Sequence, residues 1–522
     1  MKPLFETTAS IHEYIRKNRI LLIVLFLFLL LFYWAWLACA NVSLDTEYLI
    51  NHPDSDYNWL SSGRFGLLFS RWLLGFTSFN PYFQNLIFLL CLWTFTLIMG
   101  WLLHWLGEIR SPLVIFLFMA VTLTHPVLME QFYFGLQRAE IAMGYVWTAL
   151  ALAFIFRWLE KGGAFLLVPG LLCLIFSLST YQSFAVLCLT GGLGCYLLSC
   201  RRIADSRICL RRGLLLAAVF AGSQLIVSLL GTVGAGGSDY LSNMVSWRVL
   251  SIGACLRQIL AHLRSLALGD SLFYSPLQGI CMGLMSLAAL AALSDKSSAW
   301  GKRLLTAAAG LALAFSPLFL TVFLGGAPMK RAELGLPFSL AWMCLLVWLF
   351  LQDRPFWQNK IRRFLSSLVL LLLSAALIWT QSQTSQRLLY TDNIREQSDE
   401  ALAAQLSQSI DSLGLENPTV IFVGNRPASL NASCQVGESI GLSFFDVFYA
   451  NEPYYYHSTI RILDFMGTLG YNYTAPTREQ VLAARQVSSL MAAWPEEGSV
   501  LSLDGIVVVK LSEDLEYPSS SE

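Results

Sequence analysis

The chain is poor in charged residues. Asp, Glu, Lys and Arg make up 13% of its 522 residues, whereas a typical soluble globular protein carries about 25%. The formal net charge is zero, so composition gives no reason to expect a nucleic acid as a partner. With 56% hydrophobic residues and a mean hydropathy of +0.58, the chain has the composition of a protein that crosses a membrane many times.

Several motifs of known enzymes and pumps are also missing. The sequence contains neither a P-loop nor a GxGxxG pattern between a strand and a helix, so we do not expect a pump driven by ATP on this chain. Its 11 cysteines show no zinc-type spacing with histidine, and we predict no resident metal. Only Cys434 clearly lies outside the apolar part of the chain, so a disulfide within the C-terminal region is not expected.

Long apolar runs dominate the first three quarters of the chain. The first run is too long for a typical signal-peptide core, and no small-residue cleavage site follows it, so we interpret it as a retained span. The runs occupy residues 20–40, 83–106, 112–127, 139–158, 163–180, 183–200, 213–231, 273–293, 303–324, 333–351 and 364–381. The predicted fold class is therefore an all-α polytopic membrane protein with about eleven transmembrane helices. The two runs that flank residues 179–184 would also suit a re-entrant pair.

The positively charged residues indicate an orientation. With the N-terminus in the cytoplasm, the segments on that side hold more than twice as many Lys and Arg residues as the opposite loops before residue 382. This bias is the usual signature of cytoplasmic loops. An odd number of spans then places the C-terminal region outside the cell membrane.

The C-terminal region changes in character. It has no spanning run, and it contains two helical patterns, residues 398–414 and 477–494. PTVIFVG, at residues 418–424, predicts a short buried strand, and SVLSLDGIVVVKL predicts two strands around an Asp-Gly turn. We therefore divide the chain into a transmembrane domain, residues 1–381, and a small extracytoplasmic α/β domain, residues 382–522.

The first predicted outer loop concentrates carboxylates. Asp45 and Glu47 follow the first span directly, and Asp54 and Asp56 come a few residues later. In an extended chain, residues two apart share a face, so Asp45 and Glu47 would address one site. A partly desolvated carboxylate at a membrane surface has a raised pKa and suits a general base. The competing interpretation is that these acids only solvate the loop.

Other polar residues are expected on the same side of the membrane. With Asp54 and Asp56 of the first loop, they are candidate substrate contacts: Arg64 in an interfacial helix over residues 59–76, Glu130, Gln131, Gln137 and Arg138 near membrane depth, Tyr181 and Gln182 in the turn STYQSF, and Lys330 and Arg331. Ionisable side chains inside a membrane cost free energy, so their presence there favours a functional role. Cations on the disfavoured side suggest an anionic ligand such as a phosphate. The alternatives are contacts with lipid headgroups, an ordinary turn, and an Arg138–Glu140 ion pair.

Carboxylates from one loop and cations from others suit a specific reaction. One carboxylate would deprotonate an acceptor hydroxyl as the hydroxyl attacks an anomeric carbon, and cations would stabilise the departing phosphate. A sugar held on a lipid phosphate is a donor of this kind, located at the bilayer surface.

Three stretches also resemble a known family. The acidic loop followed by WLSSGRFGLL at residues 59–68, PVLMEQFYFGLQ at 126–137 and STYQSF at 179–184 resemble the GtrII-like glucosyltransferases of bacteria, which modify O-antigen and other cell-surface glycans. The tail, AAWPEEGSVLSLDGIVVVKLS, is similar to that of Gram-positive members. The resemblance implies a GT-C-type fold, with its site on the outer face, and a polyprenyl-phosphate-linked hexose donor, with glucose as the expected sugar.

The resemblance also implies an acidic catalytic residue in the first outer loop. That role falls to Asp45 first and to Glu47 second. Many relatives have adjacent acids there, whereas this chain has Asp45-x-Glu47 and then Asp54-x-Asp56. The choice between the two pairs therefore stays open at the level of sequence, as does a divalent cation on a D-x-E or D-x-D pair.

Two other functions compete with the transferase. A transporter or flippase of lipid-linked sugars predicts polar groups at the bilayer midplane and an internal repeat, and neither is evident. A glycan polymerase or ligase usually has its large loop between late spans. The expected partners are thus a polyprenyl-phosphate sugar donor, a cell-surface glycan acceptor and the lipid bilayer, in the cell membrane.

Overall fold

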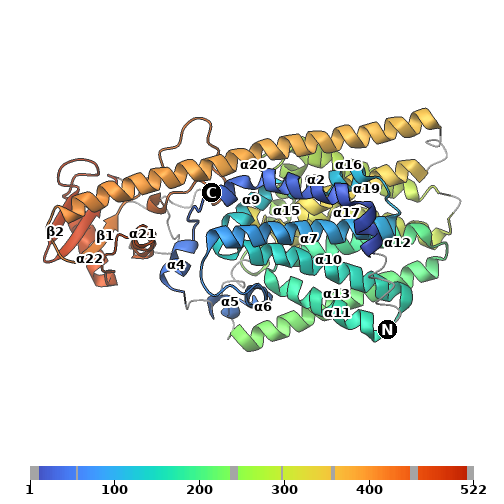
Figure 1. Cartoon of the computed structure of the whole chain (residues 1–522), viewed down its shortest axis with the longest axis horizontal. Coiled ribbons are helices and arrows are strands. Elements are labelled where there is room, and N and C mark those ends of the chain that lie inside the picture. The colour runs from blue at the N-terminus through green and yellow to red at the C-terminus, as the bar shows by residue number, and fades with distance from the viewer. Residues whose placement is uncertain are drawn as a thin grey trace. The chain divides into compact units, whose positions relative to one another are not determined.

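The computed structural model describes residues 11–53, 57–235, 245–295, 298–353, 359–446 and 456–513, and it is mostly helical (Figure 1). Two of the candidate acids, Asp54 and Asp56, lie outside the described residues.

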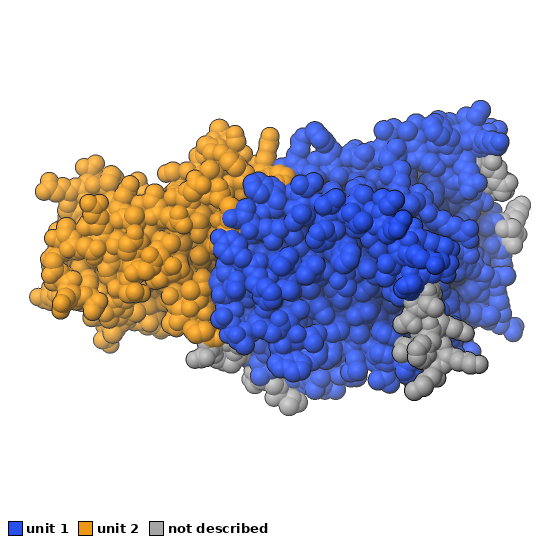
Figure 2. Space-filling model, in the orientation of Figure 1, with its two compact units in different colours: residues 1–38, 56–132, 137–385 blue, residues 39–55, 133–136, 386–522 orange. Residues whose placement is uncertain are grey.

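The chain divides into two compact units, which are coloured separately in Figure 2. Unit 1 contains residues 1–38, 56–132 and 137–385. Unit 2 contains residues 39–55, 133–136 and 386–522. The loop with Asp45 and Glu47 thus belongs to the same compact unit as the C-terminal region. The predicted domain boundary between residues 381 and 382 stays a prediction.

Most helices precede the C-terminal region. In chain order they are α2 (Arg19–Phe32), α3 (Trp34–Ala38), α4 (Thr46–Asn51), α5 (Tyr57–Ser61), α6 (Phe65–Leu73), α7 (Pro81–Gly107), α8 (Pro112–Leu123), α9 (Pro126–Tyr133), α10 (Arg138–Lys161), α11 (Ala164–Thr180), α12 (Phe184–Arg202), α13 (Ser206–Ala235), α15 (Ile252–Leu268), α16 (Pro276–Ala292), α17 (Trp300–Ala314), α18 (Phe319–Leu324), α19 (Gly335–Asp353) and α20 (Lys360–Asp411). Single 3₁₀ turns include η1 (Gly135–Gln137) and η4 (Lys330–Ala332).

The apolar helices include several that are long enough to cross a membrane. Among the described residues these are six, α7, α10, α12, α13, α19 and α20, and the number rises to eight if the bent pairs α8–α9 and α17–α18 each count as one span. The other predicted spans correspond to α2, α11 and α16, which are apolar helices of 14, 17 and 17 residues. At 1.5 Å per residue, a helix of 17 residues reaches about 25 Å, less than the ~30 Å core. The count of eleven therefore stays a prediction.

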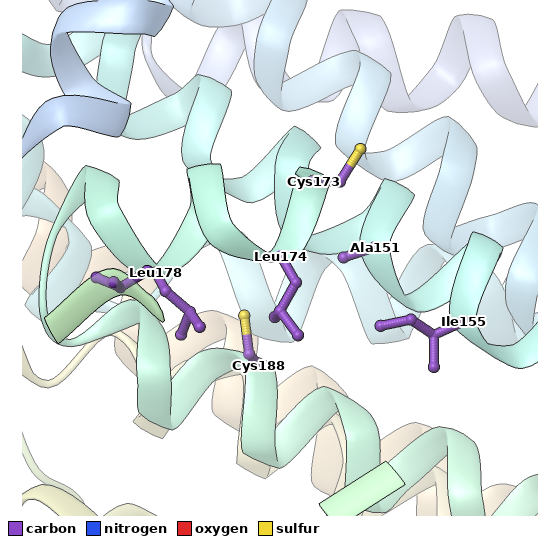
Figure 3. Close-up of a cluster of buried hydrophobic side chains, with 7 residues drawn as sticks. Ala151, Ile155, Cys173, Leu174, Leu178 and Cys188 are labelled. Atoms are coloured by element: carbon purple, nitrogen blue, oxygen red, sulfur yellow. The ribbon is translucent and has the colours of Figure 1, made fainter. Parts of the chain in front are cut away.

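The interior of unit 1 is built by close helix packing. Figure 3 shows one apolar cluster, in which Ala151 and Ile155 of α10 lie near Leu174 and Leu178 of α11 and Cys188 of α12. On another face, α12 approaches α19 at Gly194, where an added Cβ would come within 2.2 Å of Cδ2 of Trp342. Only glycine allows the two helices to approach this closely.

Helix α20 is a single helix of 52 residues. Its first part includes the apolar run 364–381, and its later part is the sequence that we expected to form a separate amphipathic helix over residues 398–414. That expectation is wrong in one respect, because the helix is continuous from Lys360. No glycine or proline occurs between Lys360 and Asp411, so nothing in the backbone interrupts the helix.

Unit 2 contains the predicted strands. They form a three-stranded sheet in the order β1-β3-β2, with β1 (Thr419–Val423) parallel to β3 (Ile506–Lys510), and β2 (Val500–Leu503) antiparallel to β3. Asp504 and Gly505 both have positive φ angles, 49° and 80°, as expected for a tight Asp-Gly turn. Two helices complete this part, α21 (Tyr456–Thr468) and α22 (Arg478–Ser488). Thr477 caps α22 together with Gln480, at the start of the helical pattern that the sequence predicted.

Candidate functional site

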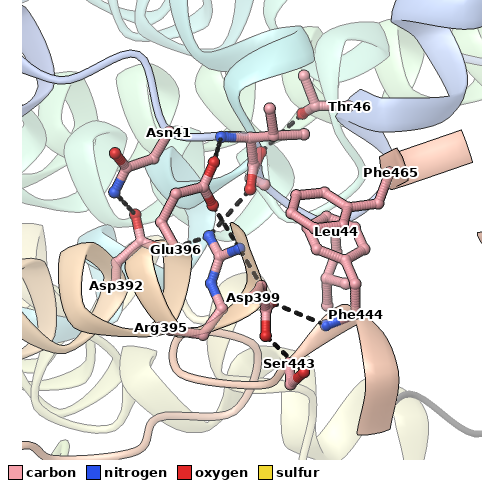
Figure 4. Close-up of polar contacts among 12 residues, drawn as sticks. Asn41, Leu44, Thr46, Asp392, Arg395, Glu396, Asp399, Ser443, Phe444 and Phe465 are labelled. Atoms are coloured by element: carbon pink, nitrogen blue, oxygen red, sulfur yellow. Dashed lines mark hydrogen bonds and ion pairs between the residues drawn. The ribbon is translucent and has the colours of Figure 1, made fainter. Parts of the chain in front are cut away.

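The first loop of unit 2 is held by backbone and side-chain contacts on several sides. The backbone N–H of Val42 donates to the Glu396 carboxylate at 2.9 Å, and Asn41 donates to Asp392 at 3.1 Å, both on α20 (Figure 4). Ser43 Oγ accepts from the backbone N–H of Gly135 at 2.8 Å. The residues just before the acidic pair are thus fixed in place before any substrate binds.

A fully buried arginine organises this anchor. Arg395 of α20 is surrounded by three carboxylates, those of Asp392, Glu396 and Asp399, and it also donates to the backbone oxygen of Val42 at 2.9 Å. Asp399 accepts in turn from Ser443 Oγ at 2.6 Å (Figure 4). A buried charge is tolerated only when it is paired and hydrogen-bonded. This network therefore ties the first loop to α20 and to the segment near Ser443.

The two acids of the loop differ sharply in exposure. Asp45 immediately precedes α4 with a left-handed backbone, φ 68° and ψ −15°, and its side chain is 55% exposed. Glu47 lies in the first turn of α4, and its side chain is 1% exposed. A non-glycine residue in the left-handed region is uncommon and often marks a functional position. The geometry gives one accessible carboxylate with a buried one beside it.

Both acids contact the same arginine from the C-terminal region. Arg461 of α21 forms an ion pair with Asp45 at 2.7 Å, from Nη2 to Oδ1, and approaches Glu47 at 3.4 Å, from Nη1 to Oε1. The Oε2 atom of Glu47 has no hydrogen-bond partner among the described residues. Burial raises the pKa of Glu47 to about 8, against the lowering effect of Arg461, and the Asp45 charge raises it further.

The end of α4 is also fixed to α21. The Asn51 amide donates to the backbone oxygens of Glu47 at 2.8 Å and of Asp464 at 2.7 Å. His52 lies 3.4 Å from the Asp464 carboxylate. Burial raises the pKa of Asp464, and the nearby His52 opposes that shift. Helix α21 thus contacts both the start and the end of α4.

Three predicted substrate contacts come together in unit 1. The guanidinium of Arg64 lies 4.6 Å from the ring centroid of Tyr181. Gln182 donates to the backbone oxygen of Ser62 at 3.1 Å. The segment before α6 and the turn between α11 and α12 therefore meet, which the sequence did not predict. The expected interfacial helix over residues 59–76 is shorter and lies at α6.

A second group of predicted contacts is deeply buried in unit 1. Arg138 donates to Asn85 and to the backbone oxygen of Phe132, and its guanidinium lies 4.1 Å from the ring centroid of Trp36. Glu130 and Gln131 are 0% exposed. The Gln131 amide and Oε1 of Gln137 have no hydrogen-bond partner among the described residues. Buried amides without partners carry a cost, so these two glutamines stay candidates for a ligand contact.

Glu140 pairs with Arg71, and its ion pair with Arg138 stays an alternative. Its carboxylate pairs with Arg71 at 3.1 Å, and both side chains are buried. An ion pair with Arg71 thus accounts for this acid of α10.

The remaining predicted cations lie at η4. Lys330 donates to the hydroxyl of Tyr274 and lies 3.2 Å from Glu333, which also accepts from Tyr274 at 2.6 Å. Arg331 contacts the sulfur of Met329 at 3.2 Å. Lys330 is therefore already paired with a carboxylate, and its role as a phosphate contact stays a prediction.

Arg461 and Arg395 were missed by reasoning from sequence. Both lie outside the apolar part of the chain, where an arginine is usually a solvated surface residue. One available signal for Arg395 was the DNIREQSD stretch at residues 392–399, in which three acids fall within four residues of the arginine. Two of them, Asp392 and Asp399, have the spacing of three and four residues that puts side chains on one helix face. Nothing in the sequence indicated the distant contact between Arg461 and Asp45.

A metal site was left open by the D-x-E spacing. Within the described ranges, no group of three or more His, Cys, Asp or Glu side chains is placed to hold a metal ion. Asp54 and Asp56 lie outside these ranges. Asp45 and Glu47 of the described D-x-E pair both contact Arg461.

The helical fold and its apolar helices define the class: several described helices are long and apolar enough to cross a membrane, as in a polytopic membrane protein. A family model described as Glucosyl transferase GtrII matches residues 34–348. The chain therefore belongs to the GtrII glucosyl transferase family and is a membrane glycosyltransferase. Comparisons with curated proteins and with solved structures gave no match.

Proposed function

We propose that the protein transfers glucose from a polyprenyl-phosphate-linked donor to a cell-surface glycan or wall polymer on the outer face of the membrane, with a GT-C-type architecture. The observation that carries the proposal is the pair Asp45 and Glu47, one exposed and one buried, both contacting Arg461 in a chain of a glucosyl transferase family. The acceptor would be a sugar hydroxyl, which needs a base to become a good nucleophile.

The chemistry that these residues support is an inverting displacement. The acceptor hydroxyl oxygen attacks the anomeric carbon, and its proton passes to the Asp45 carboxylate. The bond between the anomeric carbon and the phosphate oxygen breaks, and its electron pair leaves with the polyprenyl phosphate. Arg64, Arg138, Lys330 and Arg331 stay the predicted cations for that phosphate.

Asp45 is the better base of the two acids. Its Oδ1 atom is held by Arg461 at 2.7 Å, and its side chain is 55% exposed, so an acceptor has access to it. Glu47 is buried, and its role is to support the loop and share the arginine. This assignment keeps the order that the sequence suggested and gives it a physical reason.

The test uses the substitutions Asp45→Asn and Glu47→Gln in membranes supplied with a labelled polyprenyl-phosphate glucose donor. We expect Asp45→Asn to lower sugar transfer by about 10²- to 10⁴-fold, the usual contribution of a general base, and Glu47→Gln to lower it less. The matched control is Asp504→Asn, because Asp504 also has a positive φ angle, 49°, and lies exposed in unit 2. Full activity of Asp45→Asn would show that another group is the base.

A further inference from the structure

Arg461 lies outside the segment that carries the family match. That match ends at residue 348, whereas Arg461 belongs to α21, more than a hundred residues later. Its side chain is nevertheless 12% exposed and contacts both candidate acids of the first loop. An arginine that contacts two carboxylates gives them both charge stabilisation and a defined geometry.

We propose that Arg461 is the positioning residue of this site. It orients the Asp45 carboxylate by an ion pair. Because Arg461 also contacts Glu47, the charge of Glu47 determines how strongly Arg461 holds Asp45. The inference rests on the proposed function, because it assumes that Asp45 is the base. It assigns to the C-terminal region a direct part in the reaction.

Geometry supports the orienting role. The contact from Arg461 uses only Oδ1 of Asp45, and Oδ2 makes no hydrogen bond within the described part of the chain. The left-handed backbone at Asp45 is an unfavourable conformation for a residue with a side chain. A fixed Oδ1 and an open Oδ2 are what a base needs to accept a proton from a defined direction.

The contact of Arg461 with both acids supports its second role, in which the charge of Glu47 changes the hold on Asp45. The nearer contact of Arg461 is with Asp45, at 2.7 Å, and the longer one is with Glu47, at 3.4 Å. While Glu47 is protonated, Asp45 is the charged one of the two acids that contact Arg461. When Glu47 ionises, it competes for the same guanidinium, which weakens the hold on Asp45 and makes Asp45 a stronger base.

The charged groups that face Glu47 come from two directions. Asp45 approaches from its own loop, and Arg461 and Asp464 approach from α21. His52, just after α4, pairs with Asp464 at 3.4 Å. Arg461 favours the charged form of Glu47, while Asp45 and Asp464 oppose it. Removing Arg461 and removing Asp45 must therefore move the titration of Glu47 in opposite directions.

The experiment titrates Glu47 in the full-length protein with dicyclohexylcarbodiimide, which reacts with protonated carboxyl groups in apolar surroundings. Mass spectrometry of the Glu47 peptide gives the pH at which labelling is half complete. We expect Arg461→Gln to raise that pH by about one unit and Asp45→Asn to lower it by about one unit, the size that a neighbouring charge produces. Arg461→Lys keeps the charge and should lie near the wild type.

Sugar transfer by the same variants is the second readout. Arg461→Gln should lower transfer about tenfold or more at neutral pH, and Arg461→Lys should recover part of that loss, although a lysine cannot copy the planar fork of arginine. The matched control is Arg478→Gln, an exposed arginine of α22, which should change neither the labelling nor the transfer.

The outcomes separate this inference from the proposed function. Labelling of Glu47 that is identical in Arg461→Gln and in the wild type would overturn the inference, even if Asp45→Asn is inactive. Full transfer by Asp45→Asn would overturn the assignment of the base, while the opposite labelling shifts would still be measured. If Arg461→Gln does not fold, sugar transfer by Arg461→Lys decides the matter: transfer below that of the wild type supports the positioning role, and transfer equal to that of the wild type would overturn it.

Discussion

At the scale of single residues, the acidic pair shows how far two neighbouring carboxylates can differ. We expected Asp45 and Glu47 to share one face of an extended chain. The structure instead places a left-handed residue at Asp45 and begins α4 at Thr46. Because the helix turns Glu47 inward while Asp45 stays outside it, one acid is accessible and the other is buried. Both nevertheless reach the same arginine.

The burial of Glu47 predicts how stability depends on pH. Its pKa is raised from 4.5 to about 8, so the folded protein holds this proton more tightly than the unfolded chain does. The resulting stability is fully present below pH 4.5 and is lost as pH rises through about 8. We expect the melting temperature of the wild type to fall by a few degrees more than that of Glu47→Gln between pH 5 and pH 9.

Thermal unfolding of the purified protein in detergent measures this difference. Other groups titrate over the same range, so the informative quantity is the wild-type curve minus the Glu47→Gln curve. Glu479→Gln, an exposed acid at the start of α22, is the matched control and should follow the wild type. If the melting temperatures of Glu47→Gln and the wild type depend on pH in the same way, burial does not raise the pKa of Glu47.

The sequence could identify the acids but not their surroundings. Asp45 and Glu47 were found because they follow an apolar run directly, which is a local pattern. The partner Arg461 is more than four hundred residues away, and a contact over that separation leaves no periodic signal in one sequence. The contacts of Arg64, Tyr181 and Gln182 show the same limit, since the sequence identified these residues but not that their segments meet.

At the scale of elements, α20 is one helix that joins the apolar run 364–381 to the polar sequence after it. We expected a helix break where the composition changes near residue 382, but a helix is ended by its backbone and caps rather than by the polarity of its side chains. The first glycine after Lys360 is Gly414, with φ 68°, just past the end of the helix. The strands, by contrast, were predicted well, because their turn residues and β-branched runs are local signals.

The polar end of α20 should depend on Arg395. This side chain is 0% exposed and pairs with Asp392, Glu396 and Asp399. Its removal would leave three buried carboxylates without their cation, which typically costs about 3–5 kcal/mol. We expect Arg395→Gln to lower the melting temperature and to make the segment around Ser443 sensitive to limited proteolysis.

Arg387 provides the matched control for Arg395, because it is an exposed arginine on the same helix. Arg387→Gln should change the free energy of unfolding by less than about 0.5 kcal/mol, as surface substitutions usually do. If both variants behave alike, the carboxylates around Arg395 are stable without it, and the anchor of the first loop would have to lie in its contacts with Gly135 and Leu136.

At the scale of the whole molecule, the apolar runs and the structure agree on where helices form. Each of the eleven predicted runs falls on a helix or a bent pair of helices. They differ on which of these are long enough to cross a bilayer, because α2, α11 and α16 fall short of 18 residues. Short apolar helices can still span by local thinning of the bilayer, so helix length alone does not decide their number.

The orientation of the chain can be tested without knowing that number. The Lys and Arg bias predicts a cytoplasmic loop after α10 and an outer C-terminal region. Glu160 near the end of α10 and Ser489 after α22 are both exposed. In a background with the two partly exposed cysteines, Cys39 and Cys434, replaced by serine, Ser489→Cys should react with a membrane-impermeant maleimide on intact cells.

Glu160→Cys should react with the same maleimide only after the membrane has been opened. The two positions serve as controls for each other, since both must react in opened membranes. A lipid-phosphate donor at the outer surface needs Arg461 and Asp45 on that side. Reaction of Glu160→Cys, and not of Ser489→Cys, on intact cells would therefore contradict the orientation and would move the proposed transfer to the cytoplasmic face.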